Sequence, residues 1–158
     1  MHPALARAVR DELVNEVDLL ALAELSRLHG VPDMSPQLQL VLAMALKAGP
    51  DGDTCLDVRA VGPQSLVSGQ STSEVADGWV EELRSCPQLV EEVKGTGATH
   101  RVPFVLDGVR LYTARTHHEE LSVGTTLRTL RTDRLDVVLG GPGTGKTTYI
   151  AGELIRLF

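Results

Sequence analysis

"LDVVLGGPGTGKTTYIAGELIRLF", residues 135–158, contains the pattern that decides the fold expected for the last part of the chain. The short apolar run of Leu135, Val137, Val138 and Leu139 leads into a glycine-rich segment and predicts a strand that is buried on both faces. After the glycines, Ile150, Leu154 and Leu157 recur at helical spacing. The stretch therefore predicts a strand, a loop and a helix in that order.

The loop between this strand and this helix has the spacing G-x-x-x-x-G-K-[ST] of a phosphate-binding loop. Glycines without Cβ atoms let backbone N–H groups curl around a phosphate at the positive end of a helix dipole. Lys146 would reach the β- and γ-phosphates of ATP, and the Thr147 hydroxyl would bind Mg²⁺. An ordinary Gly-Pro turn is the alternative interpretation. The predicted ATP-binding residues are Gly140, Gly141, Pro142, Gly143, Thr144, Gly145, Lys146, Thr147 and Thr148, with Thr147 as the metal ligand and Lys146 as the one catalytic candidate.

Length and composition indicate a globular protein. The 158 residues are 42% hydrophobic, which suits one domain, or one small domain and a piece of another. Residues 7–12 include four charged side chains where a signal peptide needs an apolar run, and eighteen apolar residues nowhere follow one another. We therefore expect a soluble, cytoplasmic protein without a membrane partner. Cys55 and Cys86 lack C-x-x-C spacing and are expected to be free thiols.

Charge is unevenly distributed along the chain. The net charge is −6, but residues 1–93 hold six basic and fifteen acidic residues, whereas residues 94–158 hold nine basic and six acidic ones. The arginines of the second part could face phosphates or an acidic partner, although solvated surface is the simpler interpretation. These arginines are Arg101, Arg110, Arg115, Arg128, Arg131 and Arg134.

The first part of the chain is predicted to be helical. Apolar residues from Ala4 to about His29 repeat at helical spacing and predict two helices with a break near Val17 and Asp18. Gly30 and Pro32 are expected to end this run. A further helix is predicted with Ser35 as its N-cap, Pro36 at its first position and Gly49 at its end. Its apolar face comprises Leu38, Val41, Leu42, Ala45 and Leu46.

The middle of the chain mixes strand and helix signals. A strand is predicted over Cys55 to Val61, followed by a surface loop over residues 61–73. Asp77 is the predicted cap of a helix over residues 78–85, with Trp79 as the one large aromatic residue of the core. Val80 and Leu83 are expected to face inward with it.

A hairpin follows, with strands over residues 101–106 and 109–115. Asp107 and Gly108 are predicted to supply the two positive φ angles of a type I′ turn.

The doublets His117-His118 and Glu119-Glu120 contain residue types that bind metals. Neighbours in sequence do not face one site in a helix or strand, so solvated surface is the prediction for all four residues.

Five segments taken in order resemble the amino-terminal part of the RecD family, the alpha subunits of exodeoxyribonuclease V. They are "SPQLQLVLAMALKAG", "GDTCLDV", "WVEELRSCPQLV", "PFVLDGVRLYTAR" and "VVLGGPGTGKTT". The resemblance covers roughly residues 36–158, and the "RLY" hairpin and the "GGPGTGKTT" loop are its most specific parts.

The resemblance implies a superfamily-one helicase that moves 5′ to 3′ on single-stranded DNA within a RecBCD complex in double-strand break repair. It implies RecC-like and RecB-like partners, with the helical amino-terminal domain contacting RecC, and DNA as a ligand of the full-length protein. By position, Gly140, Gly143, Gly145, Lys146 and Thr147 would bind ATP and Mg²⁺.

The expected fold class is α+β, with a small and mainly helical domain that carries the hairpin over residues 1–115. A linker over residues 116–134 would join it to the first strand, loop and helix of a truncated P-loop α/β helicase domain over residues 135–158.

Two departures from the family pattern matter. The span 116–134 is shorter than in the family and contains no Gln, so the adenine-reading glutamine has no counterpart. The acidic Mg²⁺ motif and the arginine that meets the γ-phosphate do not follow Lys146, so we expect a helicase fragment that is inactive alone.

The alternative is a non-catalytic docking module with a vestigial nucleotide loop. A reading frame that continues beyond Phe158 into an acidic Mg²⁺ motif would favour the helicase, and an immediate stop would favour the module. A P-loop kinase or AAA-type ATPase would leave the hairpin domain unexplained.

Overall fold

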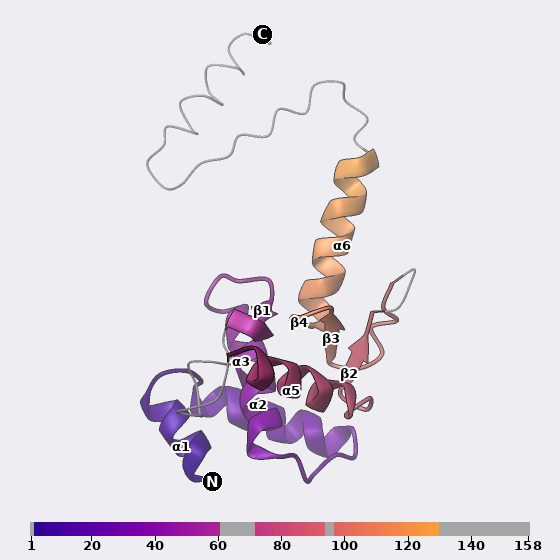
Figure 1. Ribbon diagram of the computed structural model, residues 1–158. Coiled ribbons are helices and arrows are strands. Elements are labelled where there is room, and N and C mark those ends of the chain that lie inside the picture. Colours follow the sequence, from indigo (N-terminus) through magenta and orange to yellow (C-terminus); the bar gives the residue numbers. More distant parts are fainter. Residues whose placement is uncertain (1, 61–71, 94–96, 130–158) are drawn as a thin grey trace, which may run out of the picture. The chain divides into compact units, whose positions relative to one another are not determined.

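The structure, a computed structural model, describes residues 2–60, 72–93 and 97–129. The chain divides into two units, Met1–Thr125 and Thr126–Phe158, and the first is described below. It combines helices with a four-stranded sheet, so the predicted α+β class is confirmed for this part (Figure 1). The strand, loop and helix predicted over residues 135–158 lie outside the described residues.

Helices α1 (Pro3–Arg10) and α2 (Glu16–Leu28) form the first part of the fold. The predicted break near Val17 and Asp18 is wrong by a few residues, because the two helices separate over residues 11–15. The carboxylate of Asp18 accepts a hydrogen bond of 3.0 Å from the backbone N–H of Asn15 and so caps the start of α2. As predicted, the run ends at Gly30, which has a φ of 72°.

Helix α3 (Pro36–Ala48) is the central helix of the domain and follows the prediction at both ends. The Ser35 hydroxyl accepts a hydrogen bond of 3.0 Å from the backbone N–H of Leu38, as expected of an N-cap. Leu40 and Ala43 are buried although they lie off the predicted face, whereas Leu46 of that face is half-buried. Because α1, α2, α5 and the sheet all contact α3, it buries nearly its whole circumference.

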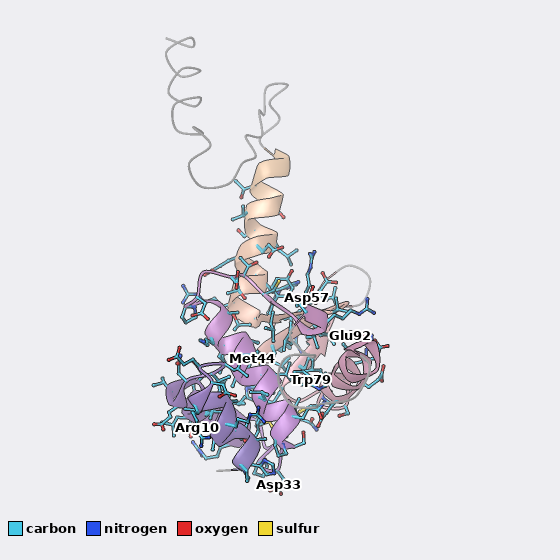
Figure 2. The ribbon with its side chains drawn as sticks, turned by 60° about the vertical axis from the view of Figure 1, so that its left-hand side comes forward. Arg10, Asp33, Met44, Asp57, Trp79 and Glu92 are labelled. Carbon is cyan, nitrogen blue, oxygen red and sulfur yellow. The ribbon has the colours of Figure 1, made fainter. Side chains whose placement is uncertain are left out.

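Helix α5 (Thr72–Arg84) begins earlier than predicted. Asp77 lies inside the helix and does not cap it, and Thr72, which was assigned to the loop, is helical. The predicted inward residues are confirmed, since Trp79, Val80 and Leu83 are all buried. Trp79 lies inside the domain (Figure 2), on the helix α5 that contacts α3.

The sheet has the strand order β1-β4-β3-β2, with β2 and β3 parallel and the other pairs antiparallel. Its strands are β1 (Leu56–Asp57), β2 (Val90–Glu92), β3 (Phe104–Asp107) and β4 (Arg110–Thr113). The prediction did not include β2.

The strand predicted over residues 55–61 is much shorter in the structure. Residues 58–60 are helical, because a carboxylate oxygen of Asp57 accepts hydrogen bonds from the backbone N–H groups of Arg59 and Ala60, at 2.9 and 3.3 Å. Asp57 therefore ends β1 by capping a helical turn.

The hairpin of β3 and β4 is confirmed, but its turn lies one residue later than predicted. Asp107 pairs with Arg110, and the two loop residues are Gly108 and Val109. Only Gly108 has a positive φ, 61°, which corresponds to a type II′ turn and not to type I′. The observed register places Asp107 opposite Arg110, whereas the predicted register would set Arg110 against the fully buried Val105.

Helix α6 (Ala114–Thr129) begins directly after β4. The part of the predicted linker over residues 116–129 is therefore helical. The domain boundaries predicted at residues 115 and 134 stay predictions.

Candidate functional site

The nine predicted ATP-binding residues, 140–148, lie outside the described residues, so Lys146 and Thr147 remain predictions. Within the described domain, two features have functional potential. One is an exposed apolar face on α2, and the other is a pair of histidines that joins α6 to the loop of residues 97–100.

Helix α2 carries apolar side chains on two opposite sides. Leu22 is 1% exposed and points into the core, as an amphipathic helix requires. Val17, Leu20 and Leu28 are 72%, 70% and 64% exposed. At helical spacing these three side chains lie on the opposite side of α2, and we call them the outer face of α2.

The outer face is interrupted by one charged pair. Glu24 lies between Leu20 and Leu28 along the helix, and its carboxylate accepts hydrogen bonds of 2.5 and 2.9 Å from the Arg27 guanidinium. This ion pair is largely exposed and neutralises the charge of Glu24 within the apolar face.

An open hollow of about 480 Å³ adjoins the outer face, where α1, the start of α2 and α3 meet. Leu20 belongs to both the hollow and the outer face. Glu16 lies on the rim of the hollow, is exposed and has no ion-pair partner within the described part of the chain. The hollow is lined by His2, Leu5, Glu16, Leu19, Leu20 and Gln39.

The histidine pair corrects the prediction of solvated surface for residues 117–120. His117 of α6 is 5% exposed, and its Nδ1 lies 2.8 Å from Nε2 of His100. The Tyr112 ring meets the His117 ring edge-on, with the ring centroids 5.0 Å apart. The prediction failed for His117 because the loop that covers it is far away in sequence. His118, Glu119 and Glu120 are exposed, as predicted.

The loop that carries His100 is held by Glu91 of β2. The Glu91 carboxylate accepts three hydrogen bonds, from the backbone N–H and hydroxyl of Thr99 at 2.6 and 2.9 Å and from the backbone N–H of His100 at 3.0 Å. These bonds, led by that of the Thr99 N–H, lower the pKa of Glu91. The loop is thereby fixed in a conformation in which His100 has a φ of 54°.

Burial, and then the neighbouring His100, lower the pKa of His117, while Asp107, Glu120 and Glu91 act in the opposite direction. A hydrogen bond between two imidazoles requires one nitrogen to donate and the other to accept. The bond is lost when both rings are protonated. The pair therefore joins α6 to the 97–100 loop only while at least one ring is neutral.

We expect acidification to destabilise the domain through His117. Since the folded-state pKa lies below the unfolded value, near 6.5, the contribution is complete above that value and is lost as the pH falls through the folded pKa. The urea midpoint of the His117→Gln variant should fall less between pH 7.5 and 5.5 than that of the wild type. The exposed neighbour gives a control, because His118→Gln should keep the wild-type slope. If the urea midpoint changes with pH equally in all three proteins, His117 is not the source of the acid destabilisation. The lowered pKa of Glu91 makes the stability of the domain depend on pH only below about pH 4.5, which lies outside the range from pH 7.5 to 5.5.

The other predicted features have simple outcomes in the described residues. Cys55 and Cys86 are free thiols, and burial raises the pKa of Cys86. The side chains of Arg101, Arg110 and Arg115 are exposed.

Across residues 2–60, 72–93 and 97–129, no cluster of three His, Cys, Asp or Glu side chains could hold a metal ion. None of the helices in these ranges has the length and apolar composition needed to cross a membrane.

Comparison with known proteins identifies the domain. Residues 10–112 match the family described as "RecBCD enzyme subunit RecD, N-terminal domain". The chain belongs to this family. The RecD match includes all of α2, α3 and strands β1 to β3 and reaches Tyr112 in β4, so the resemblance noted from the sequence is confirmed for this part and extends further toward the amino terminus.

A relative with the same description supports the assignment. The chain is 25% identical to "RecBCD enzyme subunit RecD" of Mycolicibacterium smegmatis, over 92% of this chain and 30% of that protein. The chain thus spans less than a third of the length of this relative. No solved structure matches the chain.

Proposed function

We propose that the chain is the amino-terminal part of an ATP-dependent 5′ to 3′ DNA helicase subunit of a RecBCD-type exodeoxyribonuclease V, acting in double-strand break repair. The observation that carries the proposal is the RecD family match over residues 10–112. The similarity to the mycobacterial RecD over 92% of this chain supports it, because that alignment extends beyond the described domain.

In this proposal residues 140–148 bind ATP and Mg²⁺. The glycine backbone N–H groups surround the phosphates, Lys146 neutralises charge on the β- and γ-phosphates, and the Thr147 hydroxyl is a ligand of Mg²⁺. The support is the motif itself, together with its position between a predicted strand and a predicted helix.

The described domain would dock on the other subunits of the enzyme, which are a RecC-like and a RecB-like protein. It has its own hydrophobic core, built around α3, Trp79 and the hairpin, and it leaves apolar side chains of α2 exposed. Exposed apolar residues that gather on one helix face are typical of protein interfaces. Such a domain can hold a helicase subunit in a complex without taking part in ATP hydrolysis.

We expect the chain to be captured by a RecC-like subunit in a pull-down, more strongly at low than at moderate ionic strength. Residues 1–93 carry a net charge of −9, so association with a complementary surface should depend on salt. Bovine serum albumin on the same resin serves as the acidic-protein control. Absence of capture at both ionic strengths would remove the docking role.

The alternative function is a docking module whose nucleotide loop is vestigial. It shares the docking prediction with the helicase subunit and differs only in the role of Lys146. The loss of ATP-driven unwinding in a Lys146 variant separates the two.

A further inference from the structure

The outer face of α2 has no partner within the described domain. A helix on a domain surface normally presents polar residues to water, and α2 presents Val17, Leu20 and Leu28 instead. Val17 and Leu20 lie within one turn of each other, and Leu28 follows Leu20 by just over two turns. Apolar anchors three and four residues apart are the pattern by which one helix packs against another, and Val17 and Leu20 follow it before the Glu24–Arg27 pair separates them from Leu28.

The hollow beside α2 extends the outer face into a shaped surface. Leu20 forms one wall, Leu5 of α1 forms another, and both are apolar. A side chain from a docked helix can enter a hollow of about 480 Å³. The hollow therefore favours a partner with a side chain of matching shape, in addition to the apolar contacts of the outer face.

The charge at the edge of this surface selects a basic occupant. Glu16 is exposed on the rim of the hollow and has no ion-pair partner in the described residues. The positive end of α2 offsets only part of this charge. A lysine or arginine on the docked helix would form an ion pair with the Glu16 carboxylate.

A second exposed apolar pair, on α6, is the rival surface. Leu121 and Val123 are 47% and 59% exposed, so they resemble the α2 residues in chemistry. They lie beyond residue 112, where the RecD family match ends, whereas α2 lies wholly inside it. Figure 1 shows α1 and α2 at one end of the domain and the first turns of α6 at the other, so the two surfaces can be tested separately.

We infer that the outer face of α2 and its hollow are the docking surface for an apolar helix, with a basic residue at its edge, of the RecC-like subunit. The inference rests on the proposed function, because it presumes that another subunit of the enzyme binds this domain. It adds the surface that is bound and the chemistry of the segment that binds it.

The test compares binding of variants of the whole chain to the purified RecC-like subunit. The triple variant Val17→Gln, Leu20→Gln, Leu28→Gln removes the apolar face without changing the charge, and glutamine is compatible with a helix. We expect its dissociation constant to rise at least tenfold. The control, Leu121→Gln with Val123→Gln, changes the exposed apolar residues of α6 and should bind as the wild type does.

The charge is tested by Glu16→Gln, which should weaken binding at low ionic strength and reduce its salt dependence. Asp33→Asn is the matched control, since Asp33 is exposed and does not line the hollow. The Glu16 variant retains the apolar side chains of α2, so it tests the surface even if the triple variant fails to fold, which circular dichroism would reveal.

The outcomes separate this inference from the proposed function. If the wild type does not bind the RecC-like subunit, the docking role and this inference both fall. If the wild type binds and both α2 variants bind equally well, the inference alone is overturned. Loss of binding in the α6 control but not in the α2 variants would also overturn it, as would self-association of the wild type that only the α2 variants abolish.

Discussion

We expect the Trp79→Ala substitution to lower the free energy of unfolding of the described domain by about 3–5 kcal/mol. Trp79 is 2% exposed and is the only tryptophan in the sequence. It lies on α5, which packs against α3, and its side chain is the largest in the core. Truncation removes most of its buried surface and leaves a cavity that two packed helices cannot close completely. Because a small domain has only about 5–15 kcal/mol of stability, much of the folded population would be lost on mild heating.

Urea unfolding followed by far-ultraviolet circular dichroism measures this loss, since the variant has no tryptophan fluorescence. The exposed Val123 offers a control, and Val123→Ala should change stability by no more than about 0.5 kcal/mol. Trp79→Phe should lie between the alanine variant and the wild type. A loss below about 1 kcal/mol in Trp79→Ala would mean that α5 does not depend on this residue for its packing.

Elements with local signals at both ends could be predicted from the sequence. Helix α3 has Ser35 and Pro36 before it and Gly49 after it, and the structure begins and ends the helix there. The start of α5 was misplaced because Asp77 next to Gly78 looked like a cap and loop. The spacing of Ser71 and Glu74, a capping-box pattern, was the signal for the earlier start.

Features that depend on pairing between distant residues were predicted less well. The hairpin strands were found, but the register depends on whether Asp107 belongs to the turn or to the strand. The pairing of Asp107 with Arg110 decides this, and it lets the buried Leu106 face Leu111. Local turn preference alone favoured Asp-Gly as the turn. The two-residue β1 likewise depends on a side-chain cap that a run of apolar residues does not reveal.

The two sites of the described domain were missed for different reasons. His117 is buried by the loop of His100, seventeen residues earlier, and no local pattern predicts that contact. The outer face of α2 did have a signal, since "EVDLLALAELSRL" contains more apolar residues than one helix face can hold. The phosphate-binding loop is the opposite case, because its motif is readable without any structure and its residues lie outside those described.

We expect the Lys146→Ala substitution to lower ATP-driven 5′ to 3′ unwinding by about 10²–10³-fold in the proposed RecBCD-type enzyme, assembled with a RecD subunit in which this chain continues through the rest of the motor domain. Phosphoryl transfer depends on positioning and on stabilising charge at the transferred group, and Lys146 is the cation of the predicted phosphate site. Removal of one preorganised donor from such a site costs roughly 2.7–4 kcal/mol of transition-state stabilisation. The loss should exceed any effect on assembly, because residues 10–112 carry the RecD family match and Lys146 lies outside them.

Unwinding of a duplex with a 5′ single-stranded tail measures this effect, with ATP hydrolysis and subunit assembly recorded in parallel. Thr147 provides a chemically matched pair of variants. Thr147→Ser keeps a hydroxyl that can bind Mg²⁺ and should retain most of the rate, whereas Thr147→Ala removes the ligand and should lose it. Lys146→Arg keeps the charge but changes its geometry, so it should restore binding of nucleotide better than it restores turnover. If the enzyme assembled with Lys146→Ala unwinds this duplex at the wild-type rate, the loop is vestigial in this chain. The domain would then act in docking alone, through a surface that the Lys146 variant leaves intact.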